Sequence, residues 1–283
     1  MDHSRIPTNG IRLHVVQDGP ETGPLLILLH GFPDFWYGWR RQIPDMAEAG
    51  FRVWAPDQRG YNRSQKPEGI AAYRIQELGA DVLGLADAAG EYTFFLVGHD
   101  WGAAVGWWLA EHRPDRIRRF VPINVPQGSI MSRHLRRSPT QLIKSWYIFF
   151  FQIPWLPECL ARLQNGWAAA RALRASSRPG TFTEQELDRY RQAWSRPQAL
   201  RSMIHWYRAA VRFRSKSARS LRINVPTLLL WGARDRFLDR AMAQPSIELC
   251  EDGRLVMLEE ATHWVHLEEP GKVNRAILNF FQE

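Results

Sequence analysis

The sequence contains only two cysteines, Cys159 and Cys250, among 283 residues. They lie far apart, and neither has a neighbour at metal-ligand spacing, so a small disulfide-bonded scaffold and a cysteine metal site are both excluded. Sparse cysteine use is typical of a reducing compartment, and we predict a cytoplasmic protein. No apolar signal core follows the first five residues, Met1 to Arg5.

Long apolar runs are also missing. The most apolar stretch, Trp146–Leu156, is shorter than the roughly 20 residues that span a bilayer. We therefore predict no membrane span, and we find no internal repeat and no low-complexity tract. Hydrophobic residues make up 45% of the chain and aromatic residues 12%, which is enough for a sizeable core in one large domain or one domain with an insertion.

The chain is basic, with 37 Lys and Arg against 29 Asp and Glu and a net charge of +8. Such a balance can indicate a nucleic-acid or anionic membrane partner. The arginines are scattered, however, and the densest run, Arg212–Arg222, has no nucleic-acid motif. We interpret the charge as a solvent-exposed basic face and predict no nucleic-acid partner.

Short apolar segments alternate with helical patterns along most of the chain. This alternation is typical of a mostly parallel sheet covered by helices on both faces. Lys272–Phe281 is predicted to be the last helix, since apolar residues recur there at helical spacing. The predicted strands are Leu25–Leu29, Arg52–Ala55, Thr93–Val97, Phe120–Asn124, Thr227–Trp231 and Leu255–Leu258, with Arg12–Val16 as an antiparallel edge strand.

The strand pattern disappears between Gln127 and about Leu221, and helical patterns replace it. Thr183 and Glu186 form a capping box at the start of one predicted helix, and Pro197 is expected in the first turn of another. We predict a core over residues 1–127 and 222–283, with a helical lid inserted at 128–221. The lid would cover the carboxyl edge of the sheet, where open α/β sheets bind ligands.

The most informative motif joins a predicted strand to a predicted helix: Gly98-His99-Asp100-Trp101-Gly102. A strand, a turn with glycines around one reactive residue, and a helix describe the nucleophile elbow of an α/β-hydrolase, whose central residue is held in a strained conformation. A carboxylate at that position suits displacement at a saturated carbon, which forms an alkyl ester on the enzyme. The alternative is that Asp100 only caps the following helix.

Two further motifs lie at strand ends on the same edge. His30-Gly31-Phe32-Pro33 follows a strand, and the backbone N–H groups of Phe32 and Trp101 would together form an oxyanion hole. An ordinary turn is the alternative. The segment from Asp57 to Tyr61 is interpreted as structural, fixing a loop near the site.

Asp235 and His263 follow the last two predicted strands. We predict that His263 is the general base and that Asp235 holds its tautomer, although Asp235 could instead be a turn residue. The order of nucleophile, acid and histidine is that of α/β-hydrolases. His266 is the rival base, but it lies next to the last helix, and we interpret it as a surface histidine.

The chain resembles an epoxide hydrolase of the α/β-hydrolase superfamily over nearly its whole length, in the motifs HGFPDFWYGWR, DQRGYNRS, GHDWGA and THWVHLEEP. The resemblance implies an α/β-hydrolase fold with a mostly parallel eight-stranded sheet and an all-helical lid. It also implies two lid tyrosines that act as acids on the epoxide oxygen, and Tyr147 and Tyr207 resemble these. Opening an epoxide leaves an alkoxide, to which a neutral phenol can donate. The alternative for both rings is packing, since Tyr207 shares a helical stripe with Met203.

A haloalkane or haloacid dehalogenase is the alternative enzyme, because it would form the same ester on Asp100. Many dehalogenases have a halide-binding Asn where this chain has Phe32, and many take their acid from the strand that ends here in Asn124. Both differences favour an epoxide hydrolase. A catalytically silent binding protein would need a broken triad, and every triad position holds a competent residue.

The sequence thus predicts conversion of an apolar epoxide and water into a vicinal diol, without a metal or an organic cofactor. Nearby aromatic residues predict a bulky apolar or aryl substrate. The expected substrate-binding residues are Trp36, Trp146, Phe150 and Trp155. A monomer or homodimer is expected, with detoxification, catabolism or lipid signalling as the biological role.

Overall fold

Uninterrupted apolar runs form the central strands of the structure, a computed structural model that describes residues 1–213 and 222–283. β3 (Leu25–Leu29), β5 (Phe94–His99) and β7 (Thr227–Gly232) are buried at every position. Parallel strands with helices on both faces have this composition, because neither face meets water. The other strands are β1 (Asp2–Thr8), β2 (Ile11–Asp18), β4 (Arg52–Pro56), β6 (Ile117–Ile123) and β8 (Gly253–Leu258).

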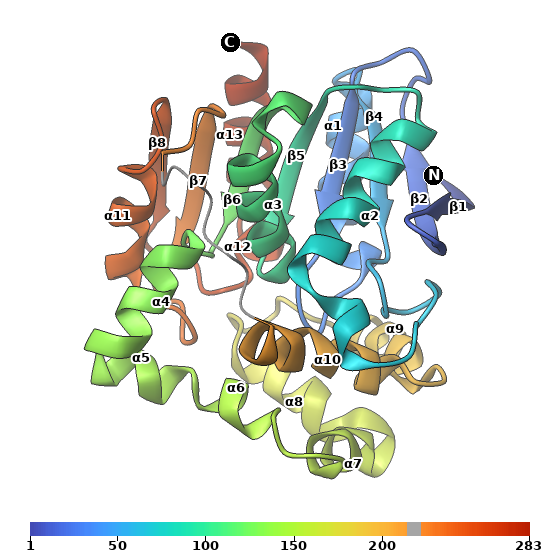
Figure 1. The fold of residues 1–283 in the computed structure, drawn as a ribbon, viewed down its shortest axis with the longest axis vertical. Coiled ribbons are helices and arrows are strands. Elements are labelled where there is room, and N and C mark those ends of the chain that lie inside the picture. Colours follow the sequence, from blue (N-terminus) through green and yellow to red (C-terminus); the bar gives the residue numbers. More distant parts are fainter. Residues whose placement is uncertain (214–221) are drawn as a thin grey trace.

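The strands form one sheet in the order β1-β2-β4-β3-β5-β6-β7-β8 (Figure 1). β2 pairs antiparallel with β1 and β4, and the other neighbouring pairs are parallel. The predicted α/β-hydrolase fold with its mostly parallel sheet is confirmed. The expectation of an edge strand at Arg12–Val16 is wrong, because β1 pairs with β2 from Asp2 to Thr8 and takes the edge.

Helices cover both faces of the sheet, and the side chains of β3 alternate between the two layers. Leu26 and Leu28 pack with α1 (Ile43–Glu48) and α13 (Pro270–Gln282). Ile27 and its neighbours on the other face pack with α2 (Ile75–Ala88) and α3 (Trp101–His112). The remaining core elements are η1 (Trp36–Trp39), η2 (Ile70–Tyr73), η3 (Pro114–Arg116), η5 (Arg240–Met242), α11 (Ala243–Ile247) and α12 (Val265–Glu268).

Between β6 and β7 the described residues form helices and no strand. The elements are α4 (Gly128–Arg137), α5 (Pro139–Lys144), α6 (Trp146–Phe150), α7 (Leu156–Arg162), η4 (Leu163–Gly166), α8 (Trp167–Ala175), α9 (Glu184–Ser195) and α10 (Ala199–Arg212). They lie below the sheet in Figure 1, and we call them the lid. The domain boundaries at 127/128 and 221/222 stay a prediction. Residues 214–221, most of the predicted basic run, lie outside the described residues.

The lid contains one predicted local signal that the structure confirms and one that is wrong. Thr183 and Glu186 form the capping box at the start of α9. Pro197 does not stand in the first turn of a helix, because α9 ends at Ser195 and α10 begins at Ala199, so the proline lies in the turn between them. No described helix has the length and apolar character that crossing a membrane requires.

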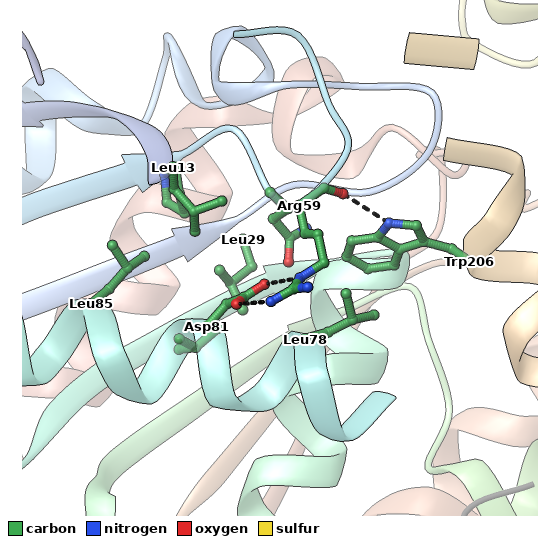
Figure 2. Close-up of a pocket in the computed structure, with 10 residues that line it drawn as sticks. Leu13, Leu29, Arg59, Leu78, Asp81, Leu85 and Trp206 are labelled. Carbon is green, nitrogen blue, oxygen red and sulfur yellow. Dashed lines mark hydrogen bonds and ion pairs between the residues drawn. The ribbon is translucent and has the colours of Figure 1, made fainter. Parts of the chain in front are cut away.

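Tryptophan N–H groups tie the lid to core loops. The Nε1 of Trp206 on α10 donates to the carbonyl of Arg59 at 3.0 Å, and the Nε1 of Trp194 on α9 donates to the carbonyl of Pro33 at 2.6 Å. Arg59 forms a buried pair with Asp81, with Nη2 and Oδ1 2.6 Å apart. Figure 2 shows this pair between α2 and the strands, with Trp206 reaching the same loop. The Arg59–Asp81 pair therefore supports the loop on which α10 rests.

We expect Asp81→Asn to lower the free energy of unfolding by about 3 kcal/mol, because it leaves the buried guanidinium of Arg59 without its charge partner. Asp115→Asn is the matched control: its pair with Arg113 is largely exposed, and we expect a change within about 1 kcal/mol. Urea unfolding of both variants measures the difference. Equal stabilities for the two variants would contradict a supporting role for the buried pair.

Candidate active site

The predicted elbow is held by backbone segments that approach too closely for side chains. Asp100 lies between β5 and α3 with φ 50° and ψ −121°, a positive-φ conformation that residues other than glycine rarely adopt. A Cβ at Gly102 would overlap the carbonyl of Leu29 on β3, and a Cβ at Gly98 would press on the backbone of Gly102. The side chain of Asp100 makes no capping hydrogen bond to α3, so it is free to face the loops above the sheet.

The carboxylate of Asp100 faces the loop after β3. Its Oδ1 accepts from the backbone N–H of Phe32 at 2.7 Å, and a Cβ at Gly31 would overlap the same carboxylate. Burial raises the pKa of Asp100, while the charge of His263 and the backbone N–H groups of Phe32 and Trp101 oppose that rise. Of the two N–H groups predicted as an oxyanion hole, that of Phe32 donates to Asp100, and that of Trp101 helps to lower its pKa.

The predicted triad residues come together. The Nε2 of His263 lies 3.7 Å from Oδ2 of Asp100, and its Nδ1 lies 2.8 Å from Oδ2 of Asp235. Burial would lower the pKa of His263, but the charge and hydrogen bond of Asp235 and the charge of Asp100 raise it overall. The ring is therefore oriented by one carboxylate and presented to the other.

Asp235 is held by more donors than the sequence suggests. Its Oδ2 also accepts from Nδ2 of Asn124 at 2.7 Å, and its Oδ1 accepts from the N–H groups of Phe237 at 2.7 Å and Leu238 at 3.0 Å. Burial alone would raise the pKa of Asp235, but His263 and these donors lower it. Asn124 follows β6 and marks no site in the sequence, yet here it fixes the acid that orients His263.

The two lid tyrosines lie over the same region. Tyr147 on α6 and Tyr207 on α10 have ring centroids 5.8 Å apart, and Tyr207 stands 5.1 Å from both Phe32 and Trp101. Burial and then the negative charge of Asp100 raise the pKa of both phenols. Both hydroxyls therefore stay protonated and can act as donors.

Two phenylalanines that sequence reasoning missed join this group. Phe151 lies 4.9 Å from Tyr207 between ring centroids, and Phe237 lies 5.8 Å from Tyr147 and 5.2 Å from His263. Phe151 directly follows α6 at the end of its aromatic run, and Phe237 follows Asp235 by two residues. Each is next to a motif, but no sequence pattern marks either residue as part of a site. They make the surroundings of the triad largely apolar.

The four predicted substrate-binding residues do not lie together in the structure. Trp146 is 63% and Trp155 80% exposed on the lid. Trp36 packs against Tyr37, with ring centroids 5.6 Å apart, and Phe150 contacts Phe151 at 6.0 Å. Of the four, Phe150 alone touches the aromatic group around Tyr207, through Phe151. Their role in binding substrate stays a prediction.

The loop predicted as structural, Asp57 to Tyr61, braces the chain at the site. The N–H of Gln58 donates to Nε2 of His30 at 3.0 Å. Asp57 accepts from the backbone N–H of Trp36 at 3.2 Å. These bonds hold the loop that carries Phe32, and so they fix the direction of its N–H.

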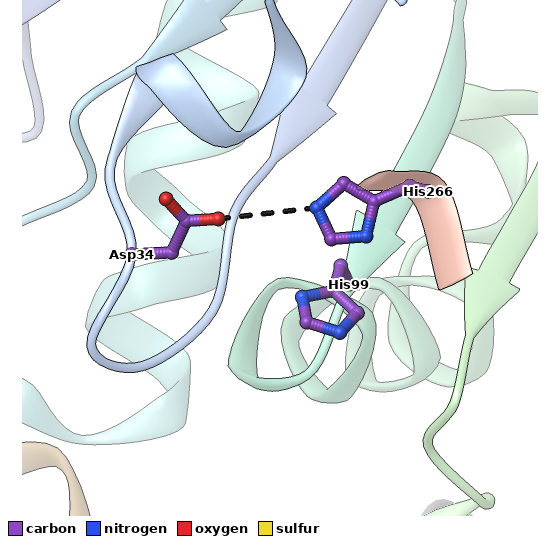
Figure 3. Close-up of side chains that lie close together, drawn as sticks. All are labelled: Asp34, His99 and His266. Carbon is purple, nitrogen blue, oxygen red and sulfur yellow. Dashed lines mark ion pairs between the residues drawn. The ribbon is translucent and has the colours of Figure 1, made fainter. Parts of the chain in front are cut away.

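The expectation of a surface position for His266 is wrong, because its side chain is 1% exposed. α12 is held to the start of α1, where Nε2 of Gln42 donates to the His266 carbonyl at 2.9 Å. The ring packs on His99, with centroids 4.3 Å apart, and burial lowers the pKa of both histidines. His266 faces Asp34 rather than Asp100 (Figure 3).

One cluster of the described residues could offer ligand atoms to a metal ion. It consists of Asp34, His99 and His266, each with one nitrogen or oxygen atom within 4.8 Å of the others. Histidine binds a metal through a nitrogen lone pair in the plane of its ring. The two imidazoles are tilted at 47° to each other (Figure 3), and Nε2 of His266 lies 3.9 Å from Oδ2 of Asp34.

A sequence profile of the family described as alpha/beta hydrolase fold matches residues 24–270. The profile covers most of the chain, and the sheet order and the elbow agree with it. The chain therefore belongs to the α/β-hydrolase family.

Relatives within that family are similar over nearly the whole chain. The AB hydrolase superfamily protein YfhM of Bacillus subtilis (strain 168) is 44% identical, covering 98% of this chain and 96% of YfhM. Human Epoxide hydrolase 4 is 35% identical, covering 99% of this chain and 78% of its own length. A mutant epoxide hydrolase from Bacillus megaterium, solved with a naphthyloxy-propanediol product, has a TM-score of 0.91 at 30% identity, covering 99% of this chain and 100% of the other. The resemblance predicted from four motifs is confirmed.

We expect nuclear magnetic resonance titration to place the pKa of His263 above the ordinary histidine value, because the two carboxylates outweigh burial. Asp235→Asn should lower that pKa, since it removes the nearer negative charge. A raised pKa in the folded state also means that the pairing stabilises the fold below the unfolded-state pKa, and that this contribution is lost as pH rises through the folded value.

Asp239→Asn is the control for this titration, since Asp239 bonds the N–H of Ala241 and does not contact His263. The His263 titration should be unchanged in that variant. A His263 pKa that did not move in Asp235→Asn would contradict the orienting pair.

Proposed function

We propose that this chain hydrolyses epoxides to vicinal diols through a covalent ester on Asp100. One observation carries the proposal: the carboxylate of Asp100 lies 3.7 Å from the His263–Asp235 pair, and the lid tyrosines, which remain protonated, pack beside the residues that flank it, Phe32 and Trp101. The related proteins with epoxide hydrolase names support the same reaction. No step of it needs a metal or an organic cofactor.

In the first step, Oδ2 of Asp100 attacks an epoxide carbon and the carbon–oxygen bond opens. Oδ1 is engaged by the N–H of Phe32, which leaves Oδ2 as the oxygen available for attack. Tyr147 and Tyr207 donate to the ring oxygen, and one phenol transfers its proton to the developing alkoxide. Such a donor matters because an alkoxide is a poor leaving group, and acid catalysis of this kind contributes roughly 10²- to 10⁴-fold.

In the second step, His263 removes a proton from water, which attacks the carboxyl carbon of the ester. Negative charge then develops on Oδ1, the oxygen that accepts from the N–H of Phe32, and the N–H of Trp101 would stabilise it as well. Asp235 stabilises the imidazolium. The intermediate collapses by breaking the bond between the carboxyl carbon and the alkyl oxygen. The leaving oxygen takes the remaining proton of the attacking water, so the diol leaves and the carboxylate is restored, while the proton on His263 returns to the tyrosine.

The proposal extends to the substrate class, the cellular location, the oligomeric state and the biological role. The aromatic side chains around the triad suit a bulky apolar or aryl epoxide, and Phe151 and Phe237 strengthen that expectation. We propose a cytoplasmic enzyme, active as a monomer or homodimer, that serves detoxification, catabolism or lipid signalling. A dehalogenase would also use Asp100, but a halide leaves without a proton and gives the two phenols no task.

We expect one turnover of styrene oxide in heavy-oxygen water, with enzyme in excess, to leave label in Asp100 and none in the diol. The reason is that the attacking water joins the ester carbonyl carbon and not the epoxide carbon. Mass spectrometry of the diol and of the peptide containing Asp100 measures both. Labelled diol with unlabelled Asp100 would mean direct attack by water.

His263→Gln provides a second measurement of the same ester, because ring opening should proceed while hydrolysis stops. The intact protein should then gain the mass of the substrate. Near-normal turnover in this variant would show that the base is another residue. Halide release from a haloalkane, without diol from any epoxide, would favour the dehalogenase.

We expect Tyr147→Phe and Tyr207→Phe each to slow ring opening by roughly 10²-fold, because each removes one donor to the alkoxide. The double variant should nearly stop alkylation of Asp100, measured as added mass in the His263→Gln background. Tyr92→Phe is the control, since Tyr92 is 64% exposed and bonds Asp115. Unchanged alkylation in the double variant would rule out the acid role of both tyrosines.

A further inference from the structure

The lid carries a concentration of exposed apolar side chains on its outer side. Of the fourteen large apolar residues exposed in the described parts of the chain, ten lie within residues 142–167. Their elements, α5 to α8, form the end of the molecule remote from the strands (Figure 1). Six residues exposed by 42% to 80% represent this surface: Ile143, Trp146, Phe149, Trp155, Leu160 and Trp167. A concentration of this kind marks an interaction site.

The same part of the chain has charge of one sign. Residues 128–175 contain seven Arg and Lys and a single acidic residue, Glu158. Glu158 is buried and paired with Arg208, so it does not offset the positive charge at the surface. Arg133, Arg136 and Arg137 on the neighbouring helix α4 make no ion pair with any described residue. Arg174, by contrast, pairs with Glu184 at the start of α9. We call Arg133, Arg136, Arg137 and the six apolar residues together the lid outer surface.

The apolar side chains are of the type found at membrane interfaces. Three of the six are tryptophans, whose rings combine an apolar body with one polar N–H and concentrate at the level of lipid headgroups. The guanidinium of Arg171 stands 5.1 Å from the ring centre of Trp167, so a cation accompanies that exposed ring. Apolar side chains beside Lys and Arg are the pattern of protein segments that lie on an anionic membrane.

We propose that the lid outer surface docks on an anionic lipid membrane. The apolar residues would enter the interfacial layer, and the arginines of α4 would face the negative headgroups. A second copy of the chain is a poorer occupant, because a two-fold interface would bring the same positive surface of both copies together.

Docking would also place the lid next to the source of an apolar substrate. Tyr147 and Phe149 stand on the same short helix, α6: Tyr147 faces Tyr207, while Phe149 is 56% exposed. The membrane would therefore lie against the outer side of the helix whose inner side faces Asp100. This consequence for substrate delivery rests on the proposed function, whereas docking itself does not.

Sedimentation with lipid vesicles tests the docking without any turnover. We expect the full chain to bind mixed phosphatidylglycerol–phosphatidylcholine vesicles and to bind pure phosphatidylcholine vesicles at least roughly tenfold more weakly, since several basic residues contribute. Binding should weaken as salt is added, because salt screens the attraction between the arginines and the headgroups.

Two variants divide the surface into its charged and apolar parts. The double variant Arg133→Glu with Arg136→Glu should reduce binding at least roughly tenfold. The control, Arg5→Glu with Arg275→Glu, changes the net charge equally but on β1 and α13, and it should leave binding nearly unchanged. Phe149→Ser with Trp167→Ser should also reduce binding, and Val256→Ser on β8 should not. Thermal unfolding confirms that each variant is folded.

Three results would overturn the proposal. The first is no binding to the mixed vesicles at low salt. The second is an equal loss in the α4 variant and its charge-matched control, which would assign the binding to net charge alone. The third is a dimer in sedimentation velocity that Phe149→Ser with Trp167→Ser dissociates, which would show that a second copy covers the surface. Diol formation from styrene oxide, measured separately, reports on the proposed function and not on docking.

Discussion

The position of Asp100 depends on backbone segments packed so closely that three residues there must lack a side chain. Gly98 and Gly102 let β5, α3 and β3 meet at the elbow, and Gly31 lets the next loop reach the carboxylate. Only at this separation does the N–H of Phe32 come within 2.7 Å of Asp100. The proposed nucleophile and the proposed oxyanion hole therefore depend on the same close packing.

Around this point the protein gives two buried carboxylates opposite electrostatic environments. Burial dominates at Asp100 and raises its pKa, whereas several donors and His263 lower the pKa of Asp235. Asp235 is thus the carboxylate whose anion is the better stabilised, and it is the one hydrogen-bonded to His263. The same negative charge of Asp100 helps to keep Tyr147 and Tyr207 protonated.

The lid has two sides with different chemistry. Its inner side carries both tyrosines and is fastened to core loops by Trp194 and Trp206. Its outer side carries exposed aliphatic and tryptophan residues beside Arg133, Arg136 and Arg137, which form no ion pair with any residue that the structure describes. A single helix, α6, contributes to both sides, because Tyr147 contacts Tyr207 while Phe149 is exposed.

Seven of the eight strands, the turn between β5 and α3 and the capping box at Thr183 were predictable from the sequence, whereas β1 was not. Each depends on local pattern: apolar runs make buried strands, and a strand-to-helix turn between glycines leaves few alternatives. The lid tyrosines were recognisable only through the resemblance, since a tyrosine in an aromatic run is otherwise equally suited to packing.

Only the tertiary structure decided which residues far apart in the chain meet. β1 took the sheet edge from β2, α12 buried His266 against His99, and Asn124 joined Asp235 across 111 residues. Phe237 met His263 and Phe151 met Tyr207 in the same way, while Trp146 and Trp155 are exposed. Sequence spacing specifies which face of its own element a side chain occupies. What that face touches depends on how the elements pack, which no local pattern contains.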